Sequence, residues 1–429
     1  MGKRAALAGL IAAIVVLAGA LVWVNRDWLG AHATWPGTSH NFARQIHKIR
    51  GEAKWREPES FKPKATRPLL LKSLALGCDY LVKNQKPAGN FNYEYDWVAR
   101  EQNKSDNQVR QAGALWGVAC CQQFAPSDER RAALDKGLAF FFAREKPAPF
   151  GGVMSVYPGE NSVDTVEVAL LALALIDYLR SDNTLPPERR QELDKHLDGY
   201  LQFIKGMQLP AGNISFRLEL GLTDRAANGI SYYDGESQLA LVKAIKYLDK
   251  TEYLPVLQKA AAKTAPLYTV DAWRKALDSA DTKGFYQWGS MTFTEYFDAG
   301  WDKAKVYGDT VLALAWWQVH THNILHKPAN TGYAFEGLTS AYHVARAQND
   351  KRAASQLAQV IDEGLYKLTT WQVGGPLASE NPFLVEHPTA DPLALGGVMN
   401  ERNKPPLRID VTGHQTHALM LALQYVYPE

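Results

Sequence analysis

Several signatures of common enzyme classes are missing from this sequence. The 429 residues contain only three cysteines, Cys78, Cys120 and Cys121, and an odd count with one adjacent pair is no disulfide framework, so buried thiols are expected. We find no phosphate-binding loop, dinucleotide fingerprint or nucleophile elbow. The closely spaced histidine pairs that begin at His320 and His414 lack a third metal ligand. The sequence therefore predicts neither a metal nor an organic cofactor.

A charge excess of either sign is also absent. Lysine and arginine together number 47, against 45 aspartates and glutamates, and no basic run interleaves with aromatic residues. Proteins that bind nucleic acid or polyanionic surfaces usually carry a basic stripe or patch. We therefore expect no nucleic-acid partner.

Long apolar runs are missing except at the N-terminus. Residues 5–24 carry no charge, which is enough to cross a hydrocarbon core at ~1.5 Å per residue, and Trp23 and Trp28 fit an interfacial belt. We expect residues 1–28 to be a single-pass anchor in a bacterial inner membrane, with the main domain exported to the periplasm. A cleaved signal peptide is the alternative, because Ala18–Ala20 fits a cleavage site.

The rest of the chain divides into a linker and one helical domain. Residues 29–67 lack sustained apolar periodicity and contain three prolines, so we expect a linker there. From 68 to 429 the apolar spacing is helical, and the phrase YLVKNQKPAGNFNY (80–93) returns as YLQFIKGMQLPAGNISF (200–216). Each copy ends one helix with proline or glycine and leads into the next.

The repeats predict an all-α domain of six helical hairpins. The expected outer helices have one solvated face, whereas the inner helices are rich in alanine, glycine and leucine on more than one face, as helices packed on both sides should be. No alternating run of β-branched residues competes with this interpretation. The outer helices are expected at 69–86, 128–146, 187–207, 252–268, 302–324 and 351–372, and the inner helices at 106–124, 162–181, 232–249, 285–299, 331–348 and 411–427.

This arrangement resembles a known architecture. Twelve helices in alternating outer and inner order, with an aromatic phrase after each outer helix, resemble the (α/α)6 toroid of six-hairpin glycosidases and their relatives. The phrases YYDGES (232–237) and RIDVTGHQTHAL (408–419) have a weaker similarity to motifs in the toroid domain of uronic acid C5-epimerases. The resemblance implies parallel inner helices whose leading segments meet at one mouth.

Acidic and aromatic side chains gather in the segments that lead into the inner helices. Aromatic faces stack on sugar rings, while carboxylates, amides and arginines bind hydroxyl or anionic groups. We therefore expect a polysaccharide or oligosaccharide to bind at the mouth. The candidate contacts are Tyr93, Tyr95, Trp97, Asp106, Arg110, Tyr157, Tyr232, Tyr233, Tyr286, Trp288, Tyr333, Asp410 and His414.

Four carboxylates are the candidates for catalysis. Opposed helices of a six-membered ring would place acids about 8 Å apart, within the window of an inverting glycosidase. Asp234, near a helix N-terminus, is expected to be the ionised base, and Glu336, beside aromatic residues, the proton donor. Glu236 is the other candidate acid, and Asp164 would face Glu336 across the ring. Asp234 and Asp164 also fit simple helix caps.

Three functions are compatible with these residues. The first is a membrane-anchored, exported glycoside hydrolase acting on an envelope or extracellular polysaccharide. The second is a uronic acid lyase or C5-epimerase, in which Tyr232 or Tyr233 and His414 move the C5 proton and an arginine neutralises the carboxylate. The third is a non-catalytic subunit that holds a glycan beside a membrane polysaccharide synthase.

Overall fold

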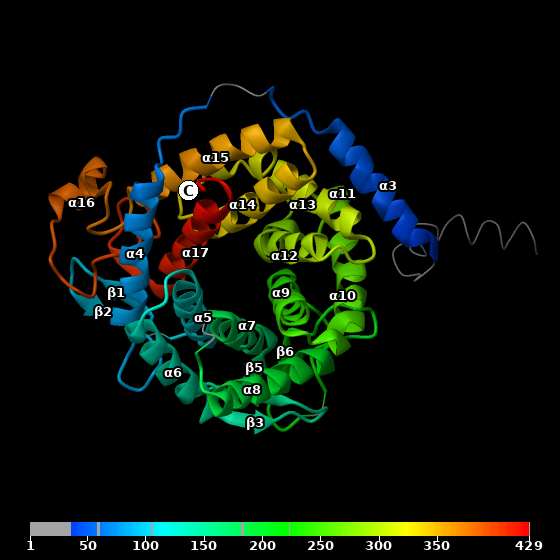
Figure 1. The fold of residues 1–429 in the computed structure, drawn as a ribbon, viewed down its shortest axis with the longest axis horizontal. Helices are drawn as coiled ribbons and strands as arrows, with labels where there is room; N and C mark the ends of the chain where they lie inside the picture. The colour runs from blue at the N-terminus through cyan, green and yellow to red at the C-terminus, as the bar shows by residue number, and fades with distance from the viewer. Residues whose placement is uncertain (1–35, 58–60, 104–105, 182–183, 223, 429) are drawn as a thin grey trace, which may run out of the picture.

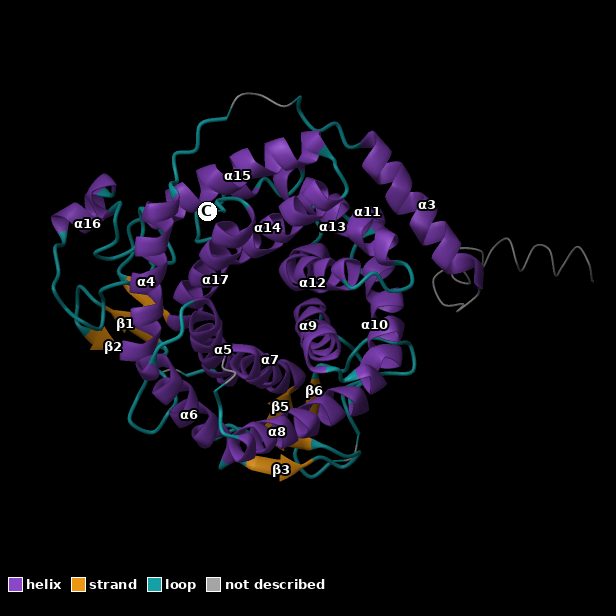
Figure 2. Ribbon diagram, in the orientation of Figure 1, coloured by secondary structure: helices purple, strands orange, loops and turns teal. Residues whose placement is uncertain are grey.

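Twelve helices form a closed double ring (Figures 1 and 2). The computed structural model describes residues 36–57, 61–103, 106–181, 184–222 and 224–428. The outer helices are α4 (Arg67–Lys83), α6 (Asp128–Phe142), α8 (Pro187–Gly206), α10 (Leu254–Leu267), α13 (Ala304–His320) and α15 (Lys351–Thr369). The inner helices are α5 (Gln108–Phe124), α7 (Thr165–Ser181), α9 (Ser231–Leu248), α12 (Ala280–Asp298), α14 (Gly332–Ala347) and α17 (Ile409–Tyr425). The predicted (α/α)6 toroid is confirmed.

The inner ring closes through its two ends. Each inner helix packs on the next in chain order, and α17 returns to pack on both α4 and α5. Helix α7 is buried from Thr165 to Leu179, whereas α15 buries only one stripe, which includes Leu357, Ile361 and Leu365. This difference is the one that the apolar pattern indicated, because a helix covered on both sides needs apolar residues all round.

The repeated phrase folds into the same turn in both copies. Gly89 and Gly212 adopt φ angles of +108° and +113°, a region that favours glycine. The side-chain amides of Gln85 and Gln208 each donate a hydrogen bond of 2.9 Å to the carbonyl of that glycine. The internal repeat therefore encodes a fixed connection between an outer and an inner helix.

Short antiparallel strands decorate these connections (Figure 2). Strand β1 (Glu94–Asp96) lies between β2 (Glu101–Gln102) and β7 (Pro406–Arg408), β3 (Glu145–Pro147) pairs with β4 (Val153–Ser155), and β5 (Ser162–Asp164) with β6 (Arg217–Glu219). Pairing of β1 with β7 ties the first connection to the segment before α17, the last inner helix.

Helix α12 begins earlier than predicted. It starts at Ala280 rather than at residue 285, because Ser279 caps it by accepting hydrogen bonds from the backbone N–H groups of Asp281 and Thr282. The first turn is polar, so apolar periodicity did not reveal it.

The expectation of three thiols is wrong. Cys78 of α4 and Cys121 of α5 form a disulfide, and only Cys120 is a free, buried thiol. Adjacent residues on a helix point about 100° apart, so Cys121 faces the outer helix while Cys120 faces another direction. An odd cysteine count did not exclude one bridge.

Part of the expected linker is helical. Helix α3 (Pro36–Glu52) packs against α13, with Ile46 fully buried, and Arg50 forms an ion pair with Asp350 at 2.7 Å. Helix α11 (Val270–Lys275) and helix α16 (Pro382–Glu386) are short additions to the ring. The sequence did not indicate α3 because its apolar residues show no sustained period and prolines lie in the same segment.

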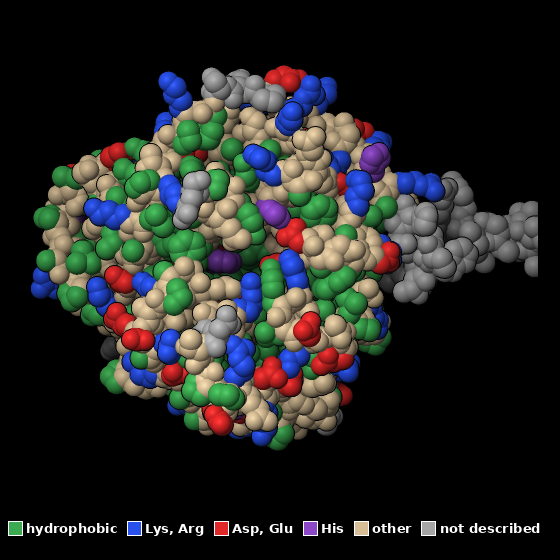
Figure 3. Space-filling view, viewed as in Figure 1, with side chains coloured by type: hydrophobic (Ala, Val, Ile, Leu, Met, Phe, Trp, Pro, Cys, Tyr) green, Lys and Arg blue, Asp and Glu red, His purple; other side chains and the backbone are tan. Residues whose placement is uncertain are grey.

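The expected membrane anchor, residues 1–28, lies outside the described residues. Within the described part of the chain, which begins at residue 36, no helix combines the length and apolar character needed to span a bilayer. Figure 3 shows basic and acidic side chains mixed over the face seen there, in line with the balanced composition.

Candidate functional site

A cavity of about 350 Å³ lies inside the ring, lined by residues from the N-terminal halves of the inner helices and from the loops beside them. This volume is within the range of small-ligand sites. Eight of the predicted residues line it, which agrees with the expectation that the leading segments converge. They are Arg110, Tyr232, Tyr233, Glu236, Trp288, Tyr333, Asp410 and His414.

Glu236 is the most unusual group in the cavity. Its side chain is only 5% exposed, and its Oε2 has no hydrogen-bond partner among the described residues. Burial raises the pKa of this carboxyl well above its ordinary value. Burial therefore favours the neutral, protonated form of Glu236, and its Oε2 is an unsatisfied polar atom where a ligand would bind.

A histidine and glutamate cluster extends the wall formed by α17. Nδ1 of His414 lies 3.3 Å and Nδ1 of His417 lies 2.9 Å from Oε1 of Glu336, and the amide of Gln287 donates to Oε2. Burial alone would lower the pKa of His414, but the charge and hydrogen bond of Glu336, together with the charge of Asp410, outweigh it and raise that pKa. Nε2 of His414 has no hydrogen-bond partner within the described residues, so it is free for proton transfer.

The role predicted for Glu336 is not compatible with this geometry. Its side chain is completely buried behind the two histidines and does not line the cavity. Burial favours the neutral acid, but His414 and His417 outweigh burial and lower its pKa. Glu336 is therefore an ionised partner of the histidines rather than a proton donor, because the aromatic neighbours seen in sequence matter less than the imidazoles brought in by α17.

Two arginines of the cavity lining, Arg110 and Arg408, contact the same carboxylate, that of Asp410. Nε and Nη2 of Arg408 lie 3.1 and 2.5 Å from the two oxygens of Asp410, and Nε of Arg110 lies 3.3 Å from Oδ2. Arg110 also donates to the hydroxyl of Tyr93. Burial opposes ionisation of Asp410, but the arginines outweigh it and lower its pKa. Tyr93 itself lies behind Arg110, outside the cavity lining.

Aromatic rings form the floor and one side of the cavity. The rings of Trp116 and Trp288 are 5.4 Å apart, and Trp116 meets the imidazole of His417 edge-on at 4.9 Å. Tyr232 is 43% exposed and lies at the opening with Tyr333. Rings in these positions suit stacking against a sugar.

Asp234 is neither a base in the cavity nor a helix cap. It is fully buried, and its carboxylate accepts hydrogen bonds of 2.6 Å from the backbone N–H of Ile214 and from the hydroxyl of Tyr268. Gln111, the fourth residue of α5 as Asp234 is of α9, binds the backbone of Phe91 in the same way. Asp234 therefore fixes the repeated turn.

Three further candidates also lie outside the cavity lining: Asp106, Asp164 and Tyr157. Asp164 accepts a hydrogen bond from Nε of Arg217 at 2.7 Å and one from the hydroxyl of Tyr233 at 3.2 Å. Asp106 accepts one from Tyr157 at 2.7 Å. Since Asp164 and Glu336 both lie outside the lining, the expected pairing of these two acids across the ring is not formed.

Three aromatic candidates are structural. The hydroxyl of Tyr95 donates to Asp391 at 2.5 Å, and Trp97 packs edge-on against Phe383 of α16. Tyr286 is fully buried and donates to the carbonyl of Ala334. Sequence position near an inner helix did not distinguish these residues from those that face the cavity.

Several lining residues were not predicted. Trp116, Gly117, Cys120 and His417 follow predicted residues at helical spacing, so the helix period was a usable signal for them. Asn330 and Asn400 come from distant loops that meet through a backbone hydrogen bond of 2.7 Å, which no local pattern reveals. The lining is completed by Val109, Gly113, Leu170, Lys283, Gln287, Arg408, Val411 and Gly413.

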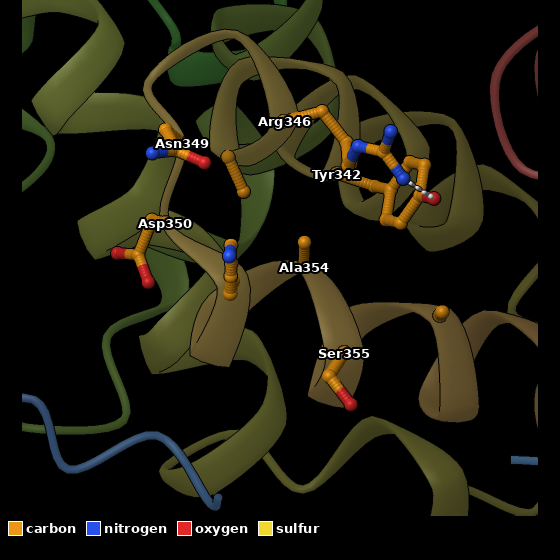
Figure 4. Close-up of a pocket in the computed structure, with 9 residues that line it drawn as sticks. Tyr342, Arg346, Asn349, Asp350, Ala354 and Ser355 are labelled. Carbon is orange, nitrogen blue, oxygen red and sulfur yellow. Dashed lines mark hydrogen bonds between the residues drawn. The ribbon is translucent and has the colours of Figure 1, made fainter. Parts of the chain in front are cut away.

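A second hollow, of about 440 Å³, lies where α14 turns into α15 (Figure 4). Tyr342, Arg346 and Asp350 line it, and Arg346 contacts the hydroxyl of Tyr342 at 3.4 Å. It is at the end of α14 opposite Tyr333, and it contains none of the predicted residues. We therefore take the central cavity as the candidate site. Among the described residues, no group of three or more histidine, cysteine, aspartate or glutamate side chains is arranged to hold a metal ion.

Comparisons with known proteins identify the fold of this chain but assign it to no family. No family model matches the sequence, and no curated protein matches it. A D-mannose isomerase structure aligns with a TM-score of 0.60 and 10% identity over 85% of this chain and 100% of that one. A glycoside hydrolase family 76 α-mannanase of Bacteroides thetaiotaomicron aligns with a TM-score of 0.56 and 11% identity, over 83% and 96%. A sugar epimerase from a ruminal bacterium aligns with a TM-score of 0.50 and 14% identity, over 69% and 86%. These likenesses show that the chain has the toroid of six-hairpin glycosidase-like proteins, as the sequence predicted.

Proposed function

We propose that this protein is a carbohydrate-active enzyme in which Glu236 donates a proton to a saccharide held in the central cavity. The observation that carries the proposal is the buried carboxyl of Glu236 in the cavity wall, whose Oε2 has no partner among the described residues and whose pKa is raised by burial. The aromatic floor supports a sugar as ligand. The solved structures of similar fold include a mannanase, an isomerase and an epimerase, all of which act on sugars by their names.

Hydrolysis of a glycosidic bond is the reaction we favour. Glu236 lies on α9, the third inner helix, and His414 lies on α17, the sixth, so they come from opposite sides of the ring. The proton of Glu236 passes to the leaving glycosidic oxygen as its bond to C1 breaks, while a water attacks C1 and gives its proton to Nε2 of His414. Glu336 stabilises the resulting imidazolium. This route inverts the configuration at C1.

Epimerisation or elimination on a uronic sugar is the second candidate. The observation that favours it is that a histidine backed by Glu336, rather than a second free carboxylate, faces Glu236. Burial raises the pKa of Tyr233, and the charge of Asp164 adds to that rise, so its phenol stays protonated and can serve only as a donor. His414 would then remove the carbon-bound proton.

Replacement of Glu236 by glutamine tests the proposal. The purified chain is incubated with a panel of neutral and acidic polysaccharides, and three products are followed: new reducing ends, ultraviolet-absorbing unsaturated sugars, and deuterium taken up from solvent. We expect Glu236→Gln to lower turnover by about 10²- to 10⁴-fold, as loss of a general acid does. New reducing ends indicate hydrolysis, whereas the other two products indicate the second candidate.

Asp234→Asn is the matched control, because it lies on the same helix two residues away and does not line the cavity. Turnover that is unchanged in Glu236→Gln, or lost equally in both variants, would contradict the proposal.

Membrane attachment and export are part of the same proposal. We infer a single-pass anchor in residues 1–28 that holds the toroid outside the cytoplasm, near an envelope polysaccharide and its synthase. The Cys78–Cys121 disulfide supports this location, because such bridges persist in oxidising compartments. Protease added to intact spheroplasts should digest the domain; full protection would contradict export.

A further inference from the structure

We infer that the saccharide bound in the central cavity carries a negative charge, as a carboxylate, sulfate or phosphate, and that Arg110, Arg408 and Lys283 bind this group. The inference rests on the proposed function and names the class of its substrate. It is carried by the charge and the hydrogen-bonding capacity of the cavity wall.

The cavity has more positive than negative groups. Three cationic side chains, Arg110, Lys283 and Arg408, line it, against two carboxyls, Glu236 and Asp410. Burial favours the neutral form of Glu236, which adds to this excess, whereas the arginines favour the ionised form of Asp410. This excess is local, because the whole chain is nearly balanced at 47 basic and 45 acidic residues.

Both guanidinium groups have donors to spare. A guanidinium carries five N–H donors. Arg408 donates two of them to Asp410, whereas Arg110 donates one to the hydroxyl of Tyr93 and its Nε forms an ion pair with Asp410 at 3.3 Å. Within the described residues, the remaining donors have no recorded acceptor, although both side chains line the cavity. Two guanidiniums held side by side by one carboxylate form a rigid fork for an oxyanion.

Lys283 adds a mobile charge at the opening. It lies in the first turn of α12 with an exposed side chain, and it lines the same cavity as the arginines. A flexible ammonium at the rim attracts an anionic ligand without being required for the fold. The three cations therefore come from three segments of the inner ring and line the same cavity.

The test compares anionic and neutral sugars in binding to the full chain. Galacturonate, glucuronate and mannuronate, with their oligomers, are titrated beside galactose, glucose and mannose and the matching neutral oligomers; sulfated and phosphorylated sugars, inorganic sulfate and inorganic phosphate form further arms. We expect at least one anionic saccharide to bind, more weakly as salt increases, and its neutral counterpart to bind about tenfold more weakly or worse. The arm that binds identifies the carboxylate, sulfate or phosphate.

Three variants localise the binding. Lys283→Glu should weaken anionic binding by about tenfold, whereas Lys351→Glu, an exposed lysine at the second hollow, should not change it. Arg110→Lys keeps the charge but loses the fork, so binding should weaken several-fold with the salt dependence retained. Equal binding of neutral and anionic sugars, no binding by any anionic sugar of the panel, or an unaffected Lys283→Glu variant would overturn the inference.

Glu236→Gln separates this inference from the proposed function. Glutamine keeps a hydrogen-bonding side chain at this position, so the variant should still prefer anionic over neutral saccharides in binding while its turnover is lost. If the unchanged chain binds anionic saccharides selectively but turns none of them over, the inferred substrate class stands and the proposed enzymatic function is refuted. If the unchanged chain turns over a neutral sugar and this turnover depends on Glu236, the proposed enzymatic function stands and the anionic substrate class is refuted.

Discussion

Replacing Asp234 by asparagine should make the protein more stable at neutral and alkaline pH without changing its chemistry. The carboxylate of Asp234 is completely buried, where it accepts bonds from Ile214 and Tyr268. Burial raises its pKa from an ordinary value of 3.8 to about 7, although those bonds oppose the rise. An amide keeps the acceptor for Ile214, and Gln111 fills the equivalent position in the first repeat.

The magnitude follows from proton linkage. Because the pKa of the folded carboxyl is above that of the unfolded one, the folded chain binds the proton more tightly, and its stabilisation is complete below pH 3.8 and lost as pH rises through 7. A difference of roughly three pH units corresponds to about 4 kcal/mol. Relative to the unchanged chain, Asp234→Asn should therefore gain up to about 4 kcal/mol of stability between pH 4 and pH 8.

Urea unfolding followed by tryptophan fluorescence across this pH range gives the comparison, since the 12 tryptophans report tertiary packing. All other titrating groups are common to the two proteins, so the difference between their free energies of unfolding isolates Asp234. Parallel stability curves would refute the raised pKa. A stable variant with greatly reduced turnover would instead place Asp234 in catalysis and refute its structural assignment.

Three further outcomes are expected. Glu336→Gln removes the charge that raises the pKa of His414, so the acidic limb of the kcat/KM profile should move to lower pH; an unmoved limb would exclude His414 as the base. Cys78→Ser opens the bridge to Cys121, which spans 43 positions, and should cost about 4 kcal/mol in the free energy of unfolding under oxidising conditions, with no difference once the bridge is reduced. Gly89→Ala forces a side chain into φ +108° and places its Cβ 2.4 Å from a backbone oxygen of α6. The free energy of unfolding, measured by thermal unfolding, should therefore fall by about 1–3 kcal/mol or more. An unchanged Tm would contradict the fixed turn.

Local pattern was sufficient for most of the helices. The apolar period placed α7 and α15 in the correct layers because burial on two sides and on one side requires different compositions. It failed where the signal was polar, as in the first turn of α12, and where the apolar residues showed no sustained period and prolines lay in the same segment, as in α3.

The direction in which each polar side chain points was beyond the sequence. Asp234 and Glu236 are two residues apart, about 200° around a helix, and one faces the outer layer while the other faces the cavity. Both positions looked equivalent in the sequence. The pattern indicates that the segment lies near the mouth, but it does not indicate how the helix is rotated about its axis. Asn330 and Asn400, or Glu336 and His417, meet only after the ring closes.

The sequence by itself determined the number of hairpins, the alternation of inner and outer helices, and the turn that the repeat encodes, since all of these depend on contacts close in the chain. The tertiary structure decided the Cys78–Cys121 bridge, the choice of Glu236 over Asp234, and the ionisation of Glu336. These depend on which distant side chains share one buried space, and a pKa in such a space is set by neighbours that no local pattern contains.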